Sequence, residues 1–479
     1  MSADAPGRFD VAVVGAGVAG LSCAIEAATA GATVAVVDAA PEPGGTAGVA
    51  GGGTCIAGSD LQLRQGIEDS ADQALEDWIA WGGDSVDVAW AERYLRDSRV
   101  ELFDRLGAAG VEWVAVHARE GNRHPRWHQP AGGGARVMSL LSAHARTLPG
   151  ITWLTGHRVT RLVSAGGRVT GLTADGPTGE VEVVAGRTVV ASGGFNNNHA
   201  MVSELAAEAA GAERVLLGGG LGAVGEGHRM LADVGAQFSQ LDAVWMFPYG
   251  TPDHRAPAGH RGLAVRGIDD DIWVNDEGNR FHDESLRSGA TGTKALLAQP
   301  NGRCWSVIDA RLAATMTIAD PYYRNGSTPL RERIEEFLRT SPHVVSARSL
   351  DELAARMDVD RVNLRDAVGE LNTAVTAGEQ RERSFGKDMT GRGTVAQAPF
   401  HAIRFHPVAR KNLGGVRTDL SCQVLDRSGR AIEGLYAAGE VAGMAGGRIN
   451  GRAALEGTSF GPSMYSGLVA GRSVVDRSS

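Results

Sequence analysis

The chain has 479 residues, 66 of which are glycine, and a formal net charge of −9. An apolar fraction of 43% suits a large buried core rather than a disordered chain, and the glycines show no Gly-X-Y period, which excludes collagen. The acidic charge and the low aromatic fraction of 5% argue against a protein that binds nucleic acid.

The four cysteines are widely spaced and form no C-x-x-C pair, which argues against zinc ribbons, attached haem and iron–sulfur clusters. We expect reduced thiols packed in the core, and no metal site. The first residues lack a signal-peptide pattern, and the apolar run that begins at Val11 is interrupted by glycine. We therefore expect a cytoplasmic protein without a membrane span.

The first predicted elements form a dinucleotide-binding fingerprint. Residues 9–14 are apolar except for Asp10 and run directly into Gly15-Ala16-Gly17-Val18-Ala19-Gly20, a G-x-G-x-x-G pattern. A helical pattern over 21–30 follows, and then a strand over 33–37 that ends in Asp38. In this motif the glycines allow a tight turn, close approach of a pyrophosphate and close packing of helix on strand, while the acid accepts a ribose hydroxyl. The spacing therefore predicts a nucleotide cofactor.

A second G-x-G-x-x-G match covers residues 220–225, after the apolar residues 215–217. No strand that ends in an acid follows at the required distance. We therefore interpret this match as the entry to a helix near 226–231 rather than as a second nicotinamide site.

Later features favour FAD over NAD. A glycine-rich loop over 44–53 follows Asp38, and an apolar strand over 188–191 ends in Ser-Gly-Gly at 192–194. A third strand, 434–438, ends in Gly439 and Glu440. A helix is predicted over 463–474, and its N-terminus would stabilise negative charge on a flavin pyrimidine ring.

We expect the FAD contacts to come from these turns, loops and strand ends. The residues concerned are Gly15, Gly17, Ala19, Gly20, Asp38, Gly44, Gly45, Thr46, Gly52, Gly53, Val159, Ser192, Gly193, Gly194, Gly439, Glu440, Ser459 and Phe460.

These motifs resemble the flavoprotein family of soluble fumarate reductases, succinate dehydrogenase flavoprotein subunits and 3-ketosteroid dehydrogenases. The resemblance implies that Glu440 serves the flavin ribityl chain and that the backbone of Val159 contacts adenine. The segment 413–419 is similar to the family's motif with a glycine pair, which stands where an inserted domain rejoins the FAD domain. Some relatives attach FAD through a histidine, but residues 46–48 contain none, so we expect non-covalent FAD.

The resemblance also implies an α/β architecture. A Rossmann-type FAD-binding domain would be split between residues 1–245 and 408–479, with an α+β substrate-capping domain inserted at 246–407. Helical periodicity over 328–340 and 350–377 is compatible with this arrangement.

Relatives move a hydride between flavin N5 and a saturated carbon, so we looked for cations that could polarise a carbonyl or bind a carboxylate. The first cluster, 123–136, contains Arg126 and His128, and we favour both as site residues, with His128 as catalytic, because the glycines that follow them suggest close approach to a ligand. A solvated basic loop is the alternative. In the second, Arg287 is either a proton shuttle or a surface arginine, while Arg280 and Glu284 are expected to form a structural pair.

Two further clusters depart from the family pattern. Arg410 and Lys411 stand where fumarate reductases have a histidine pair, which puts fumarate itself in doubt but keeps an anion-binding character. Near 447–457 the fumarate reductases have a substrate-clamping arginine and ketosteroid dehydrogenases a catalytic tyrosine; here Arg452 is the nearest candidate, with a role at the rim as the alternative. Tyr465 is expected to pack inside the last helix.

The sequence thus predicts an FAD-dependent oxidoreductase acting on a C–C bond next to a carbonyl or carboxylate, with dehydrogenation favoured over ene reduction. The small-molecule substrate would be a keto or carboxylic acid, and the electron acceptor or donor would be external. The alternatives are a 3-ketosteroid-type dehydrogenase, an amino-acid oxidase resembling L-aspartate oxidase, and a non-enzymatic electron carrier.

Overall fold

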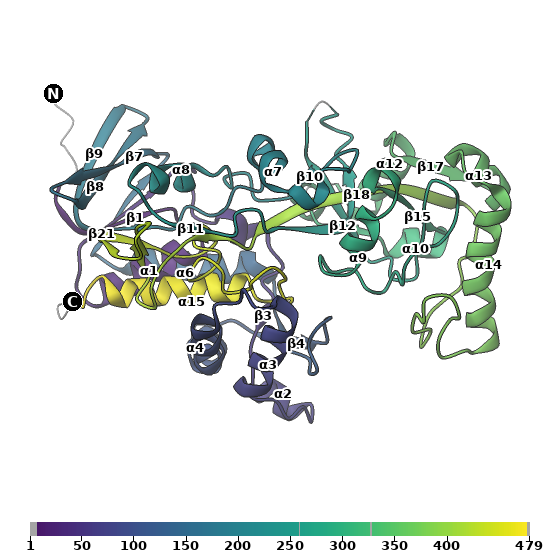
Figure 1. Cartoon of the computed structure of the whole chain (residues 1–479), viewed down its shortest axis with the longest axis horizontal. Coiled ribbons are helices and arrows are strands. Elements are labelled where there is room, and N and C mark those ends of the chain that lie inside the picture. Colours follow the sequence, from purple (N-terminus) through teal and green to yellow (C-terminus); the bar gives the residue numbers. More distant parts are fainter. Residues whose placement is uncertain (1–6, 258, 326–327, 477–479) are drawn as a thin grey trace. The chain divides into compact units, whose positions relative to one another are not determined.

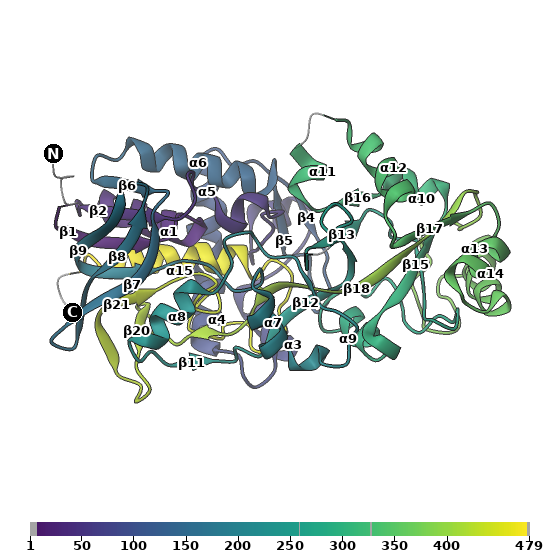
Figure 2. The same ribbon diagram turned by 90° about the horizontal axis from the view of Figure 1, so that it is seen from above.

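The computed structural model describes residues 7–257, 259–325 and 328–476 (Figures 1 and 2). Two compact units are present. The first contains Met1–Met201, Gly219–Trp245 and Lys411–Ser479, and the second contains Val202–Gly218 and Met246–Arg410.

The first unit is built on a sheet in the order β20-β21-β8-β9-β1-β2-β6, with β7 paired to β8. Strands β21, β9, β1, β2 and β6 run parallel to one another. The apolar residues of β1 are buried on both faces, as expected for a parallel sheet covered by helices. The bounds are β1 Phe9–Val14, β2 Val34–Asp38, β6 Ile151–Thr155, β7 Arg158–Ala165, β8 Arg168–Gly176, β9 Gly179–Val190, β20 Gln423–Leu425 and β21 Ala431–Ala437.

Helices α1 (Val18–Thr29) and α15 (Phe460–Ser473) pack closely because α15 carries small residues. A Cβ added to Gly467 would lie 2.2 Å from the carbonyl oxygen of Ala19, and one on Gly471 would lie 2.6 Å from that of Cys23. A larger side chain at either position would separate the two helices. This contact fixes the N-terminus of α15 relative to the turn that follows β1.

The first unit contains further helices and two smaller sheets. A small sheet orders as β3-β5-β4. The bounds are β3 Thr54–Cys55, α2 Asp60–Arg64, α3 Ala71–Gly82, α4 Val88–Ser98, α5 Arg105–Ala108, β4 Trp113–His117, β5 Trp127–Pro130, α6 Gly133–Thr147, α8 Glu226–Asp233, β11 Phe238–Ser239 and β19 Gly415–Val416. Helix α7, His199–Leu205, joins the two units.

The second unit is centred on a largely antiparallel sheet in the order β14-β15-β18-β12-β13-β16. Its strands are β10 Leu216–Leu217, β12 Val244–Pro252, β13 Gly262–Arg266, β14 Ile272–Val274, β15 Cys304–Ile308, β16 Thr317–Ile318, β17 Val344–Ala347 and β18 Phe400–Asn412. Its helices are α9 Gly292–Leu297, α10 Ala310–Thr315, α11 Pro321–Asn325, α12 Leu330–Thr340, α13 Leu350–Met357 and α14 Arg361–Ala377.

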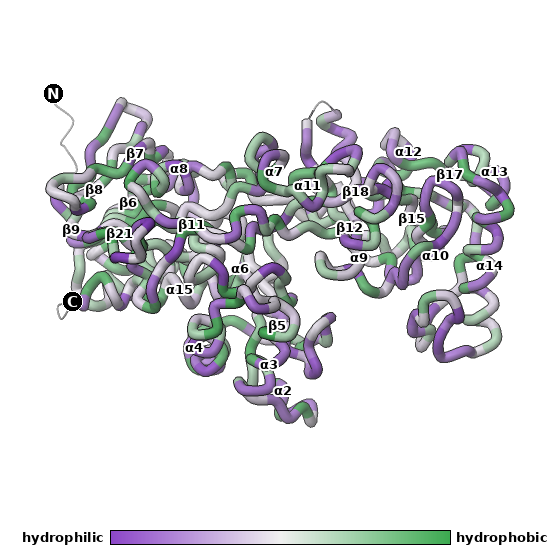
Figure 3. The backbone as a smooth tube through the Cα atoms, viewed as in Figure 1, coloured by the Kyte–Doolittle hydropathy of each residue, from purple (hydrophilic) through white to green (hydrophobic). Residues whose placement is uncertain are grey.

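The helical stretch expected over 350–377 is divided into α13 and α14. Asp358 follows α13 with a φ of 57°, a left-handed conformation that ends the helix, and Asp360 then caps α14 through the amides of Val362 and Asn363. Figure 3 shows hydrophilic and hydrophobic residues alternating along α14, as expected for a helix with one buried face. Among the described residues, no helix combines the length and apolar character needed to cross a membrane.

All four cysteines are buried and unpaired to one another, as the wide spacing predicts. The second G-x-G-x-x-G match does lead into a helix, α8, which begins at Glu226 after Gly225. This confirms its interpretation as a helix entry.

Candidate flavin site and candidate catalytic residues

The glycines of the turn after β1 differ in whether the fold leaves space for a side chain. A Cβ on Gly15 would lie 2.6 Å from the carbonyl oxygen of Ala191, and one on Gly20 would lie 1.8 Å from that of Gly15, so both glycines are needed for packing. A Cβ on Gly17, at the start of α1, would meet nothing within 4 Å. The open space therefore lies at the position where the motif brings a pyrophosphate to the backbone.

Asp38 ends β2 and holds the same turn. Its carboxylate accepts hydrogen bonds from the amides of Ala16 (2.5 Å) and Ala40 (2.7 Å), one on each oxygen. Each carboxylate oxygen can accept more than one hydrogen bond. A ribose hydroxyl can therefore still donate to Asp38, and the existing bonds orient the side chain for it.

The loop predicted to follow the flavin packs on the N-terminal end of α6. A Cβ on Gly52 would lie 2.6 Å from the amide nitrogen of Gly134, and one on Gly53 would overlap the Trp127 ring at 1.8 Å. Gly44 donates its amide to the carbonyl of Ala16, at 3.1 Å, and a Cβ on Gly44 would meet nothing within 4 Å. The loop is thus fixed on one side and open beside Gly44.

Thr46 has a neighbour from the second glycine-rich match. A Cβ on Gly220 would lie 2.3 Å from Thr46 Oγ1, and one on Gly227 would lie 1.9 Å from Ser192 Oγ. These glycines let the 219–227 segment pack on the loop and on the strand end after β9. The segment that contains the second glycine-rich match therefore packs against two of the predicted cofactor residues, Thr46 and Ser192.

Glu440 lies in a hydrogen-bonded network that joins three strand ends. Its Oε1 accepts from Asn196 Nδ2 (2.8 Å) and from the amide of Asn412 (3.1 Å), and Asn412 Oδ1 accepts from Asn196 Nδ2 (3.1 Å). A Cβ on Gly194 would lie 2.1 Å from Asn412 Oδ1, so a side chain there would disrupt the network. Burial raises the pKa of Glu440 to about 7, while the Asn412 amide, Lys411 and Asn196 oppose the shift.

The N-terminus of α15 lies beside this strand end. The amide of Gly439 donates to Ser466 Oγ at 3.0 Å, which ties the end of β21 to the helix. Ser459 occupies the N-cap position of α15 but makes no capping hydrogen bond, and its buried hydroxyl has no partner among the described residues. The Ser192 hydroxyl and Asn196 Oδ1 are likewise buried without a partner in the described part of the chain.

These observations fit a bound dinucleotide. Open space at Gly17, Gly44 and Gly193 provides close backbone approach, and the polar atoms of Ser192, Ser459 and Asn196 lack partners that a ligand could supply. The sequence analysis did not select Asn196 and Asn412 as site residues. The feature that could have identified them is an asparagine two residues from each glycine pair, 193–194 and 414–415. Ala19, Val159 and Phe460 are all at least nine-tenths buried.

The predicted catalytic His128 is fully buried on β5. Its Nε2 is 2.7 Å from Ser59 Oγ and its Nδ1 is 2.9 Å from the Arg126 carbonyl, while burial lowers its pKa to about 4. Arg126 is also fully buried and pairs with Asp69 (2.7 Å) and Asp77 (2.6 Å). This is not the solvated basic loop of the alternative, and it favours a structural role for both residues.

Arg287 lies in the second unit and is held by an ion pair with the buried Asp271. Its Nε donates to the Glu284 carbonyl at 2.7 Å. Arg280 and Glu284 form the expected structural pair at 2.7 Å, and Lys387 also contacts Glu284, at 2.9 Å. Because Arg287 is anchored in this way, its geometry favours orientation of the local chain over free proton transfer.

Arg452 lies in the first unit, between β21 and α15. Its guanidinium is half exposed and pairs with Asp242 at 2.7 Å. Arg410 and Lys411 are partly exposed near the end of β18. Arg452 is thus half exposed, whereas Arg410 and Lys411, like Arg287, are only partly exposed. Tyr465 is buried and donates to Asp97, as expected for packing.

Comparison with known proteins gives a consistent picture. The family described as FAD binding domain matches residues 10–460. A KsdD-like steroid dehydrogenase of Mycobacterium tuberculosis is 29% identical over 98% of this chain and 96% of its own length. An NADH:fumarate oxidoreductase of Klebsiella pneumoniae is 29% identical over 95% of this chain, which spans 47% of that protein.

A solved structure shows the same fold. The 3-ketosteroid-Δ4-(5α)-dehydrogenase from Rhodococcus jostii, in complex with 4-androstene-3,17-dione, is 25% identical with a TM-score of 0.74, covering 100% of this chain and 98% of that one. Together with the match over residues 10–460, the mixed α/β fold and the fit of the glycine-rich turns identify the chain as a member of the FAD-binding family, an oxidoreductase whose cofactor is FAD.

Proposed function

We propose that the protein catalyses hydride transfer at a carbon–carbon bond next to a carbonyl or carboxylate, with dehydrogenation favoured. One observation carries the proposal. The named ligands of the relatives, fumarate and 4-androstene-3,17-dione, share a C=C bond conjugated to a carbonyl group, although the molecules otherwise differ. When bound, FAD supplies the hydride acceptor at N5.

In this proposal the first unit is a split Rossmann-type FAD-binding domain and the second is the substrate-capping domain, near residues 246–407. The predicted residues of the turns, loops and strand ends hold FAD without a covalent bond, since residues 46–48 contain no histidine. Glu440, fixed by Asn196 and Asn412, is placed to hydrogen-bond the ribityl chain.

The chain's cations would bind and orient the substrate. Arg452 offers a planar guanidinium with two parallel donors that match a carboxylate, and Arg410 and Lys411 add positive charge. A bound carboxylate or carbonyl would be polarised by these groups, which acidifies the neighbouring C–H bond. A keto or carboxylic acid therefore fits the proposed site.

A 3-ketosteroid substrate is the second candidate, because the steroid dehydrogenase of M. tuberculosis matches nearly the full length of both chains. The two candidates differ in what must be recognised: a carboxylate requires cations, whereas a steroid presents a large apolar surface and a ketone. A loss of activity in Arg452→Ala limited to acids would favour the first.

The test is anaerobic reduction of the bound flavin by a panel of saturated carboxylic acids, cyclic keto acids and 3-ketosteroids. Bleaching of the flavin by one class, with a matching unsaturated product, identifies the substrate class. If no such compound reduces the flavin, whereas an amino acid does and releases peroxide, the proposal is wrong. Acid denaturation should release FAD into the supernatant; flavin retained on the precipitated chain would contradict non-covalent binding.

A further inference from the structure

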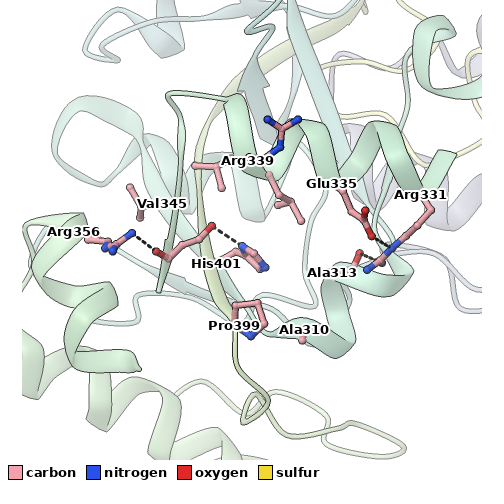
Figure 4. A pocket seen from close by; sticks show the side chains of 12 residues that line it. Ala310, Ala313, Arg331, Glu335, Arg339, Val345, Arg356, Pro399 and His401 are labelled. Atoms are coloured by element: carbon pink, nitrogen blue, oxygen red, sulfur yellow. Dashed lines mark hydrogen bonds and ion pairs between the residues drawn. The ribbon is translucent and has the colours of Figure 1, made fainter. Parts of the chain in front are cut away.

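A pocket of about 870 Å³ lies within the second unit, between α10, α12, β17 and β18 (Figure 4). Its volume falls within the range of about 300–1,000 Å³ that is usual for small-molecule sites. All its lining residues belong to the second unit, whereas every residue predicted to contact FAD belongs to the first. The pocket is therefore not built from the residues predicted to bind FAD.

The charged side chains that line the pocket are unequal in sign. Arg331, Arg339 and Arg356 contribute three positive charges, against one negative charge from Glu335 among the lining residues, and Arg356 also pairs with Glu352 at 2.6 Å. Arg331 pairs with Glu335 at 2.7 Å. Arg339 is exposed and makes no hydrogen bond or ion pair with any described residue. One arginine in the wall thus has its full set of donors available for an anion.

Arg356 and His401 are held in place by the same serine of β17. Arg356 donates to the Ser346 carbonyl at 2.6 Å, and Ser346 Oγ lies 2.7 Å from His401 Nδ1. Figure 4 shows His401 between Arg356 and Arg331. His401 is nine-tenths buried, and its Nε2 has no partner in the described part of the chain. Burial lowers the pKa of His401, which favours the neutral imidazole, while Asp309 opposes the shift.

The rest of the pocket is apolar. Its apolar walls come from α10, α12, β17 and the residue before β18: Ala310, Ala313, Leu338, Val344, Val345 and Pro399. An inorganic anion would leave these walls in contact with water. An anion with an aliphatic body would cover them and gain the free energy of apolar burial. The arginine fork matches a carboxylate bidentately.

We infer that this pocket binds a small organic carboxylate with an aliphatic chain. The carboxylate lies at Arg339, and the chain lies along the alanine and valine walls toward His401. None of the residues predicted to bind FAD or to act in catalysis lines the pocket, and the inference neither requires nor tests the proposed reaction.

The experiment is a ligand-observed NMR titration of the full-length, FAD-loaded protein with hexanoate. Two probes separate the chemistry: 1-hexanol keeps the chain without the charge, and inorganic phosphate keeps the charge without the chain. We expect saturable binding of hexanoate below about 10 mM, and binding of both other probes that is weaker by about tenfold or more. Equal binding of phosphate, equal binding of hexanol, or no saturable binding of hexanoate would overturn the proposal.

Two variants locate the site. Arg339→Gln should weaken hexanoate binding by about fivefold or more through loss of a charge-assisted hydrogen bond, and Val345→Trp should abolish it by filling the pocket. Arg383→Gln is the matched control, because Arg383 is an exposed arginine of the same unit with a side chain 85% accessible. Unchanged FAD content and circular dichroism verify folding. Binding that survives Arg339→Gln and Val345→Trp in folded protein places hexanoate elsewhere and refutes the inference.

Discussion

Substitution of Gly17 by alanine should separate cofactor binding from folding. Gly17 has φ −76° and ψ −174°, a conformation that alanine adopts readily, and its added Cβ would meet no protein atom within 4 Å. The fold should therefore tolerate Gly17→Ala, with a gain of up to about 1 kcal/mol from the reduced entropy of the unfolded chain. The methyl group would instead occupy the space that the pyrophosphate is predicted to need.

The expected loss can be estimated from overpacking, which costs about 1–3 kcal/mol and converts to a rise in the Kd for FAD of about 5- to 150-fold. The assay is flavin fluorescence titration of apoprotein, with thermal unfolding of the apoprotein measured in parallel. Gly107→Ala is the matched control, because its Cβ also meets nothing within 4 Å but lies in α5. An unchanged FAD affinity in stable Gly17→Ala would refute the assignment of this turn to FAD.

Three further outcomes test the site. Burial raises the pKa of Glu440 to about 7 from an ordinary value of 4.5, so the folded apoprotein binds this proton more tightly than the unfolded chain does. The contribution of Glu440 to the free energy of unfolding is therefore lost as the pH rises from about 4.5 to about 7. Glu440→Gln should remove that part of the pH dependence of thermal unfolding. Arg287→Ala should destabilise the protein by about 3 kcal/mol in urea unfolding, since it removes the ion pair of the buried Asp271 carboxylate, which keeps among the described residues only hydrogen bonds from Trp273 and Ser306. Arg452→Ala should cost less than about 1 kcal/mol, because its pair with Asp242 is half exposed, yet lower turnover with FAD content unchanged; normal kinetics would remove Arg452 from the site.

The fingerprint near the N-terminus could be predicted because every part of it is local. The strand that ends at Val14, the turn and Asp38 lie within 30 residues, and the glycine spacing itself determines how the backbone turns. The same applies to α15, although it begins at Phe460 rather than at 463. Local patterns of this kind need no knowledge of distant partners.

The catalytic candidates were harder to judge because a cation's role depends on residues far away in sequence. Arg126 looked like part of a basic cluster, but the fold brings Asp69 and Asp77 to it and buries all three charges. His128 was favoured for the glycines that follow it, yet those glycines serve the packing of α6 on the 47–53 loop. No spacing rule in the sequence reveals either contact.

The glycines of the cofactor region are thus required for different physical reasons, which the number of glycines alone does not distinguish. At Gly15, Gly20 and Gly194 a Cβ would overlap atoms of the protein, so glycine is required by the apoprotein itself. At Gly17, where φ is −76°, a Cβ would meet open space, so neither packing nor backbone conformation explains the glycine. A Cβ on Gly44 would also meet open space, but its φ of 158° and ψ of −56° form a conformation that itself favours glycine. A residue that the fold does not require, in a turn that a ligand motif predicts, is best explained by the ligand. Gly17 is therefore the position where substitution should affect FAD affinity without destabilising the apoprotein.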